Sequence, residues 1–203
     1  MSRLKGLGVA ALGESQRALI NAITGGKRAK DRDRASFFLA DGSLRGPFNA
    51  WLHAPSVGQP AQALGEAIRF DSSLSPRLRE LAILSVAAFW RADYEWWAHR
   101  PIAVAAGLPE PVVAGIMAGE LPRTADAELR AVYEFSMELM TGHRISDTVY
   151  EDVADRLGER GTVELVAVIG YYTLVAMTLN AFQVGMPEGA KPPFANVDRP
   201  SKE

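Results

Sequence analysis

The stretch SPRLRELAILSVAAFWRADYEWWAHRPIAVAAGL, residues 75–108, decides the fold. Ser75 is a residue type that caps the start of helices, and Pro76 follows it at the first helical position, where proline is favoured. Residues 81–90 contain a single polar side chain and no Gly or Pro. A helix this apolar must be buried on nearly all sides. The sequence therefore predicts a helix that belongs to the core.

A second helix is expected directly after the first. Asp93 is a suitable N-terminal cap, and Gly107 is a natural stop. Residues three and four apart share a helix face, and one such stripe consists of Ala92, Glu95, His99, Ile102, Ala103 and Ala106. Because most of its members are small or apolar, the stripe should face inward and take Glu95 and His99 with it. The two helices predict a helical hairpin over about residues 76–107.

The rest of the chain is also dominated by helical patterns. Further helices are expected over residues 57–70, 108–120, 124–142, 146–158 and 160–182. Residues 46–55, GPFNAWLHAP, read as an aromatic loop, and no stretch alternates strictly enough to predict a strand. The fold class expected is all-α, a single-domain helical bundle.

Composition limits the possible functions. The 203 residues carry a formal net charge of −2, so no positive field exists to attract nucleic acid or an anionic membrane surface. The longest apolar run, residues 165–179, is shorter than the roughly 20 residues that a membrane span requires. We therefore expect no nucleic-acid partner, no membrane and a cytoplasmic location. With no cysteine in the chain, disulfides, thiolate metal sites and thiol catalysis are excluded.

Glu80, Glu95 and His99 are the candidate catalytic residues. Burying ionisable groups is costly unless they satisfy one another, so a Glu and a His one turn apart on an inward face need a reason. Glu80, on the preceding helix, should be largely buried as well. The structural alternative is that Glu95 and His99 form a satisfied core contact, with Glu80 paired to Arg77 as an ordinary helix ion pair.

Residues 79–108 resemble the central helical hairpin of the carboxymuconolactone decarboxylase family, which includes the alkylhydroperoxidase D-like proteins. In the peroxidase branch, a helix glutamate is followed by a Cys-x-x-Cys motif and then by a histidine one turn later. Glu80 and His99 match the glutamate and the histidine, whereas the two cysteine positions hold Ala92 and Glu95. The resemblance therefore points to the cysteine-free, decarboxylase-like branch.

This resemblance extends over residues 46–188 and implies an alkylhydroperoxidase D-like fold that associates as trimers or hexamers. The predicted organisation is one domain over residues 1–203. Within it, residues 1–45 are an N-terminal extension and approach to the aromatic loop, residues 46–188 are the family-like core, and residues 189–203 are an extended tail.

Aromatic side chains are expected around the trio as substrate-binding residues. The candidates are Tyr94, Trp96, Trp97, Phe48, Trp51 and Tyr172. Plain packing is an equally good explanation for Phe48 and Trp51. His53 and His143 lack metal-ligand spacing and are expected to be surface or capping residues, so no metal site is predicted.

The function expected is a cofactor-independent acid–base lyase, decarboxylase or isomerase acting on a small organic acid, lactone or related carbonyl compound. His99 would exchange a proton with the substrate, Glu95 would orient the imidazole, and Glu80 would tune or relay the proton. The main alternative is a catalytically silent homo-oligomer that binds a small ligand. A peroxidase-type antioxidant protein is a further alternative, against which the absence of cysteine argues.

Overall fold

The computed structural model describes every residue except 1, 9–11, 31–32, 122–124 and 195–203. Regular structure in the described part is helical, apart from one isolated antiparallel bridge between Phe38 and Leu44. The all-α prediction is therefore confirmed. The chain forms two compact units, an N-terminal unit of residues 1–73 with 178–185 and a site unit of residues 74–177 with 186–203. The domain boundaries expected at residues 46 and 188 stay predictions.

The N-terminal unit is built from short helices. They are α1 Glu14–Gly25, η2 Lys27–Ala29, η3 Arg34–Phe37, α2 Phe48–Leu52 and α3 Pro55–Phe70. The apolar face of α1, which includes Leu19 and Ile23, is buried, and α1 packs against α3. The sequence patterns had not indicated α1.

The prediction that residues 46–55 form a loop was wrong. They contain α2, whose residues Ala50, Trp51 and Leu52 are buried, and α2 packs against α3. Five residues are too few to reveal a helical period in the sequence. Only the packing against α3 shows why this segment forms a helix.

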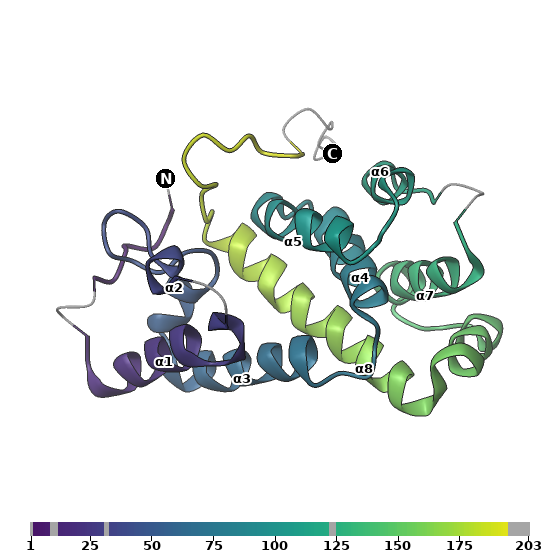
Figure 1. Cartoon of the computed structure of the whole chain (residues 1–203), viewed down its shortest axis with the longest axis horizontal. Helices are drawn as coiled ribbons and strands as arrows, with labels where there is room; N and C mark the ends of the chain where they lie inside the picture. Colours follow the sequence, from purple (N-terminus) through teal and green to yellow (C-terminus); the bar gives the residue numbers. More distant parts are fainter. Residues whose placement is uncertain (1, 9–11, 31–32, 122–124, 195–203) are drawn as a thin grey trace. The chain divides into compact units, whose positions relative to one another are not determined.

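Helix α4, Pro76–Phe89, is the central element of the site unit. It packs against α5 Asp93–Ala105, α6 Glu110–Ala118 and α7 Ala127–Gly142 (Figure 1). Every residue from 80 to 87 is buried, as the nearly uninterrupted apolar run requires. The predicted hairpin of α4 and α5 is confirmed.

The two helices of the hairpin begin differently. The Ser75 hydroxyl caps α4 as predicted, accepting a hydrogen bond from the backbone N–H of Leu78 at 3.3 Å. Asp93 is not the cap of α5, because the N-cap is Ala92 and Asp93 is the first helical residue. Its carboxylate instead accepts the backbone N–H of Phe194 at 2.9 Å. That partner lies 101 residues away and no local pattern indicates it.

Helix α8, Asp147–Ala181, contains one break. Gly158 has φ 67° and ψ 174°, a backbone conformation open essentially only to glycine, so the helix consists of two segments. The break falls where the sequence predicted two separate helices. The last turn of α8, from Thr178, belongs to the N-terminal unit.

In the described part of the chain, α8 is the one helix long and apolar enough to cross a membrane by length and composition. The apolar window has a mean hydropathy of 1.6, and 56% of it is buried inside the protein. Core helices of soluble proteins meet the same criterion. The apolar character of α8 is therefore explained in part by burial.

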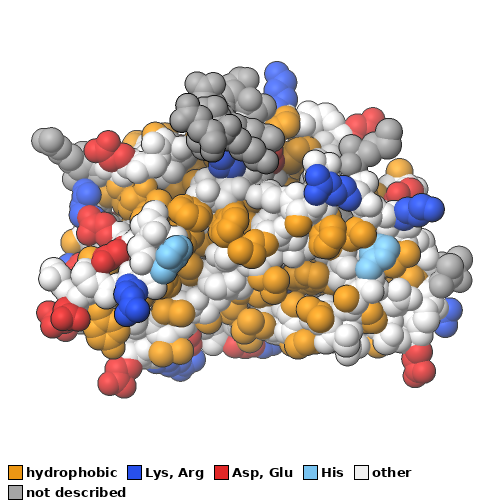
Figure 2. All heavy atoms as spheres, turned by 180° about the vertical axis from the view of Figure 1, so that it is seen from behind, with side chains coloured by type: hydrophobic (Ala, Val, Ile, Leu, Met, Phe, Trp, Pro, Cys, Tyr) orange, Lys and Arg blue, Asp and Glu red, His pale blue; other side chains and the backbone are white. Residues whose placement is uncertain are grey.

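Some hydrophobic side chains of α8 nevertheless reach the surface, as others do elsewhere on the molecule (Figure 2). Val163, Val166, Leu174 and Met177 are all exposed, with 69% of Val163 open to solvent. Their spacing places them on one face of the helix, which we call the α8 patch. Exposed apolar patches of this kind commonly mark contacts with another protein chain.

We predict that Gly158→Ala destabilises the protein by about 1–3 kcal/mol, because alanine is strained at this backbone conformation. No atom lies within 4 Å of an added Cβ, so the loss would come from the backbone alone. Gly142→Ala is the control, since Gly142 ends α7 and has the same open space around it. Urea denaturation of both variants measures the difference. Equal stabilities would contradict the conformational argument.

We also predict that the protein self-associates through the α8 patch. Light scattering at micromolar concentration should give a multiple of the 22.0 kDa chain mass. Val166→Glu combined with Leu174→Glu should lower that mass, because two charges would be placed in an apolar contact. Tyr150→Glu, on the other segment of α8, should leave it unchanged. A wild-type mass of 22.0 kDa would refute the prediction.

Candidate active site

A buried histidine–carboxylate pair joins the two helices of the hairpin. His99 Nδ1 on α5 lies 2.7 Å from Glu80 Oε2 on α4. Glu80 is 0% exposed and His99 is 8% exposed, so both groups are withdrawn from water. The Tyr172 ring of α8 packs edge-on against the imidazole, with 5.0 Å between ring centroids. The ring of His99 is thus fixed both by a hydrogen bond and by an aromatic contact.

The second oxygen of Glu80 faces a cation. Arg79 Nε lies 4.0 Å from Glu80 Oε1, and the Arg79 side chain is only 12% exposed. A guanidinium at this distance favours the ionised form of the carboxyl group. An ionised Glu80 accepts the Nδ1–H of His99, and the lone pair of the neutral imidazole is then on Nε2. Nε2 is therefore the nitrogen that can exchange a proton with a substrate.

Glu95 lies on the same helix as His99 but is not its partner in the pair. It is 1% exposed, and neither carboxylate oxygen has a hydrogen-bond partner among the described residues. Burial raises the pKa of Glu95 well above its ordinary value of 4.5. The sequence interpretation that paired Glu95 with His99 was wrong in this respect, because α4 brings the carboxylate of Glu80 to Nδ1. Spacing on one helix could not reveal a contact between two helices.

The aromatic candidates on α5 lie in different surroundings. Trp96 is 2% exposed and packs edge-on against Phe194, with 5.5 Å between ring centroids. Trp97 is 39% exposed and contacts Tyr94 at 5.6 Å. Successive helix residues point about 100° apart, which explains the separation. The expectation that both tryptophans bind substrate stays a prediction.

Phe194 fixes the C-terminal segment to the start of α5. Besides its contacts with Asp93 and Trp96, its carbonyl oxygen accepts a hydrogen bond from Arg91 at 3.3 Å. Arg91 has a left-handed backbone with φ 50°, in the link between α4 and α5. Sequence reasoning missed Phe194. The only available signal was a single aromatic residue in a Pro-rich tail.

Phe48 and Trp51, also proposed to bind substrate, lie on α2 in the N-terminal unit. Their rings meet edge-on at 5.6 Å, and the Arg28 guanidinium lies 4.9 Å from the centroid of the Phe48 ring. Trp51 is 5% exposed. These contacts account for both residues as parts of the packing of their own unit, and a substrate role stays a prediction.

The other two histidines have backbone partners in their own parts of the chain. His143 is the C-cap of α7, with its backbone N–H bonded to the Leu139 carbonyl, as a capping residue was expected to be. His53 is exposed, and its Nε2 lies 3.1 Å from the Lys5 carbonyl oxygen. No group of three or more His, Cys, Asp or Glu side chains in the described ranges could hold a metal ion.

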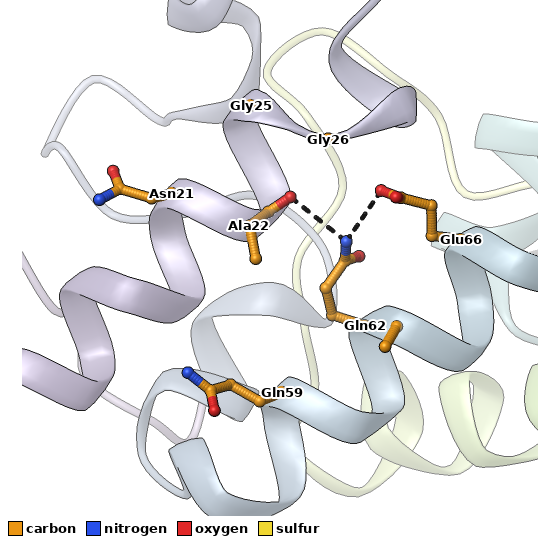
Figure 3. A pocket seen from close by; sticks show the side chains of 8 residues that line it. Asn21, Ala22, Gly25, Gly26, Gln59, Gln62 and Glu66 are labelled. Carbon is orange, nitrogen blue, oxygen red and sulfur yellow. Dashed lines mark hydrogen bonds between the residues drawn. The ribbon is translucent and has the colours of Figure 1, made fainter.

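A pocket of about 400 Å³ lies wholly within the N-terminal unit, between α1 and α3 (Figure 3). Gln62, a buried residue of its lining, donates hydrogen bonds to the Ala22 carbonyl and to Glu66 Oε2. Asn21 and Gln59 also line it. With one carboxylate and no histidine, this pocket offers polar contacts but no pair of groups for proton exchange.

The substitution Glu95→Gln tests the protonation state of Glu95 in the folded protein. Unfolded chains ionise Glu95 as the pH rises through 4.5, whereas burial keeps the folded protein protonated to higher pH. Wild-type stability should therefore fall relative to the variant as the pH rises above that value, because glutamine cannot ionise in either state.

The measurement is urea denaturation of wild type and Glu95→Gln at several values between about pH 5 and 8. The difference in unfolding free energy, variant minus wild type, should grow with pH. A difference that stays constant over this range would mean that Glu95 is ionised in the folded state.

The fold is shared with three solved structures of low sequence identity. An uncharacterized peroxidase-related protein from Ralstonia eutropha JMP134, described as an alkylhydroperoxidase AhpD core, aligns with a TM-score of 0.71, 17% identity and coverage of 92% of this chain and 93% of that chain. A similar peroxidase-related protein from Silicibacter sp. TM1040 gives a TM-score of 0.67, 13% identity and 91% coverage of both chains.

A variant of the debrominase Bmp8, in complex with 2,3,4-tribromopyrrole, gives a TM-score of 0.67 and 12% identity over 93% of this chain and 95% of that chain. Among curated protein sequences, none is significantly similar to this chain. Residues 55–136, which include Glu80, Glu95 and His99, match the model of the carboxymuconolactone decarboxylase family. This match makes the part of the chain that holds the candidate site similar to the carboxymuconolactone decarboxylase family.

Proposed function

We propose that this protein is an acid–base enzyme, a lyase or isomerase, acting without a cofactor on a small organic acid, lactone or related carbonyl compound. The observation that carries the proposal is the 2.7 Å contact between His99 Nδ1 and Glu80 Oε2 in a buried site. A carboxylate behind an imidazole fixes its tautomer and raises its basicity, which is the arrangement a general base needs.

In this proposal, His99 takes a proton from the substrate and later returns it through Nε2. Glu80 is a positioning residue, because it orients the ring and stabilises the imidazolium that forms. The Tyr172 ring, which belongs to α8, packs against the imidazole and limits its rotation. Positioned proton transfer of this kind typically contributes about 10²–10⁴-fold in rate.

Thiol chemistry is not available to this chain. It has no cysteine, and the positions that hold the paired cysteines in the peroxidase branch carry Ala92 and Glu95. Reduction of hydroperoxides by its own thiols is therefore excluded by composition, whatever the related proteins of the same fold do. A chain without thiols but with the buried pair of His99 and Glu80 is better suited to proton transfer.

The alternative from another class is a silent ligand-binding protein. The Tyr94 and Trp97 pair favours it, because two aromatic rings 5.6 Å apart and partly open to solvent could stack on a flat ligand. In that case, the pair of His99 and Glu80 would have only a structural role. The homo-oligomer, as a trimer or hexamer, and the cytoplasmic location belong to both proposals.

The experiment that separates the two proposals compares His99→Gln with His143→Asn. His99→Gln keeps the approximate size of the side chain but cannot titrate, whereas asparagine tolerates the φ of 60° at position 143. Two probes are used: acetoacetate, followed by release of carbon dioxide, and α-angelica lactone, followed by isomerisation of its double bond.

We expect wild type and His143→Asn to turn over at least one probe, and His99→Gln to be slower by at least about 10²-fold. Thermal melts check that each variant is folded. Folded wild type that is inactive on both probes, or His99→Gln with unchanged turnover, would contradict the acid–base proposal.

A further inference from the structure

Glu95 is the buried titratable group that the mechanism above leaves without a task. It is 1% exposed, its two oxygens have no hydrogen-bond partner in the described part of the chain, and it shares an inward helix face with His99. A carboxylate deprived of both water and a partner is destabilised relative to the neutral acid. The geometry alone thus favours a carboxylic acid that still carries its proton.

The charged and titratable groups of the elements around α5 have other partners. On α4, Arg79 and Glu80 face each other, and Glu80 also faces His99. At the start of α5, Asp93 accepts the N–H of Phe194. Further along α5, Arg100 pairs with Glu110 of α6.

On α8, the Tyr172 ring packs against the imidazole of His99, and the Tyr171 ring meets the Tyr172 ring at 5.1 Å. On α7, burial raises the pKa of Tyr133, so its phenol stays neutral. The raised pKa of Glu95 has burial as its cause, with no neighbouring charge to offset it. Among the described residues, no cation therefore holds Glu95 as an anion, which agrees with the geometry.

We propose that Glu95 is a catalytic general acid that donates its proton to a carbonyl oxygen of the substrate, opposite His99 as the base. The proposal rests on the proposed acid–base function and assigns its substrate class. The substrate has a carbonyl oxygen and a C–H bond on the adjacent carbon, as in a lactone or a ketone. In this proposal, Glu80 is the ionised carboxylate that accepts a hydrogen bond from the base, and Glu95 is the neutral acid that donates a proton to the substrate.

The step balances without any co-reactant. His99 Nε2 takes the proton from the carbon, and the C–H electron pair forms a double bond to the carbonyl carbon. The C=O π pair moves to the oxygen, which forms an O–H bond with the proton of Glu95. The site then holds an imidazolium and a carboxylate one helical turn apart, whose opposite charges stabilise each other.

The enol completes the reaction by reversing these transfers at a different carbon. Its O–H proton returns to Glu95, and His99 gives its proton to the carbon at the far end of the conjugated system. The double bond has moved, and both side chains are back in their starting states. For α-angelica lactone, a β,γ-unsaturated lactone, the product is the α,β-unsaturated isomer.

Infrared spectroscopy of the full-length protein tests the state of Glu95 directly. A protonated carboxylic acid has a C=O stretching band that is resolved from the bands of carboxylates. In wild type at neutral pH we expect such a band, absent in Glu95→Gln and retained in Glu110→Gln, whose parent residue is exposed and paired with Arg100. Absence of the band in wild type would overturn the proposal.

The second measurement adds α-angelica lactone. Hydrogen bonding to the lactone carbonyl should shift the Glu95 band in wild type and in His99→Gln, which keeps the acid but lacks the base. Isomerisation should fall by at least about 10²-fold in Glu95→Gln and stay unchanged in Glu110→Gln. The activity of wild type should also fall as rising pH ionises Glu95.

These outcomes separate the inference from the function on which it rests. Loss of activity in His99→Gln but not in Glu95→Gln would leave the acid–base enzyme standing and overturn the role of Glu95. A band that shifts with the lactone in a protein that turns over neither the lactone nor acetoacetate would support donation by Glu95 and contradict the proposed function. A band that the lactone leaves unchanged would overturn the donor role.

Discussion

The hydrogen bond between His99 and Glu80 is the interaction on which the rest of the site depends. It lies between two helices that are themselves enclosed by the fold, and α4 is buried along its whole middle. A hydrogen bond to a charged group contributes about 1.5–3 kcal/mol, and leaving one partner alone would cost more. In these apolar surroundings, each of the two polar groups depends on the other as its partner, because water cannot take the place of a lost hydrogen bond.

The two buried carboxyl groups have different surroundings. Glu80 has an imidazole on one oxygen and a guanidinium 4.0 Å from the other, so its charge is compensated. Glu95 has neither within the described residues, so burial raises its pKa and favours the neutral acid. A site with one ionised and one neutral carboxyl group beside an imidazole can both accept and donate protons. Glu80 and Glu95 are the same residue type, so any difference in their protonation comes from their surroundings.

The C-terminal segment completes the site unit by contacts that are mostly backbone and aromatic. Phe194 uses its N–H, its carbonyl oxygen and its ring to meet Asp93, Arg91 and Trp96. All three partners lie in or next to the first turn of α5, where helices leave backbone N–H groups without internal partners. The tail thereby holds the start of the helix that carries Glu95 and His99, so the far end of the chain supports the site.

The sequence by itself determined the helical class, the α4 and α5 hairpin, the Ser75 cap and the break near Gly158, because each depends on local periodicity or on the conformational preference of one residue. It also excluded thiol chemistry through the absence of cysteine. Only the tertiary structure decided that His99 pairs with Glu80 and not with Glu95, that Asp93 binds the tail, and that Trp96 is buried while Trp97 is exposed. These features depend on which helix faces which. Spacing along one helix fixes a shared face, but the partner of a buried polar group is fixed by the element packed against that face.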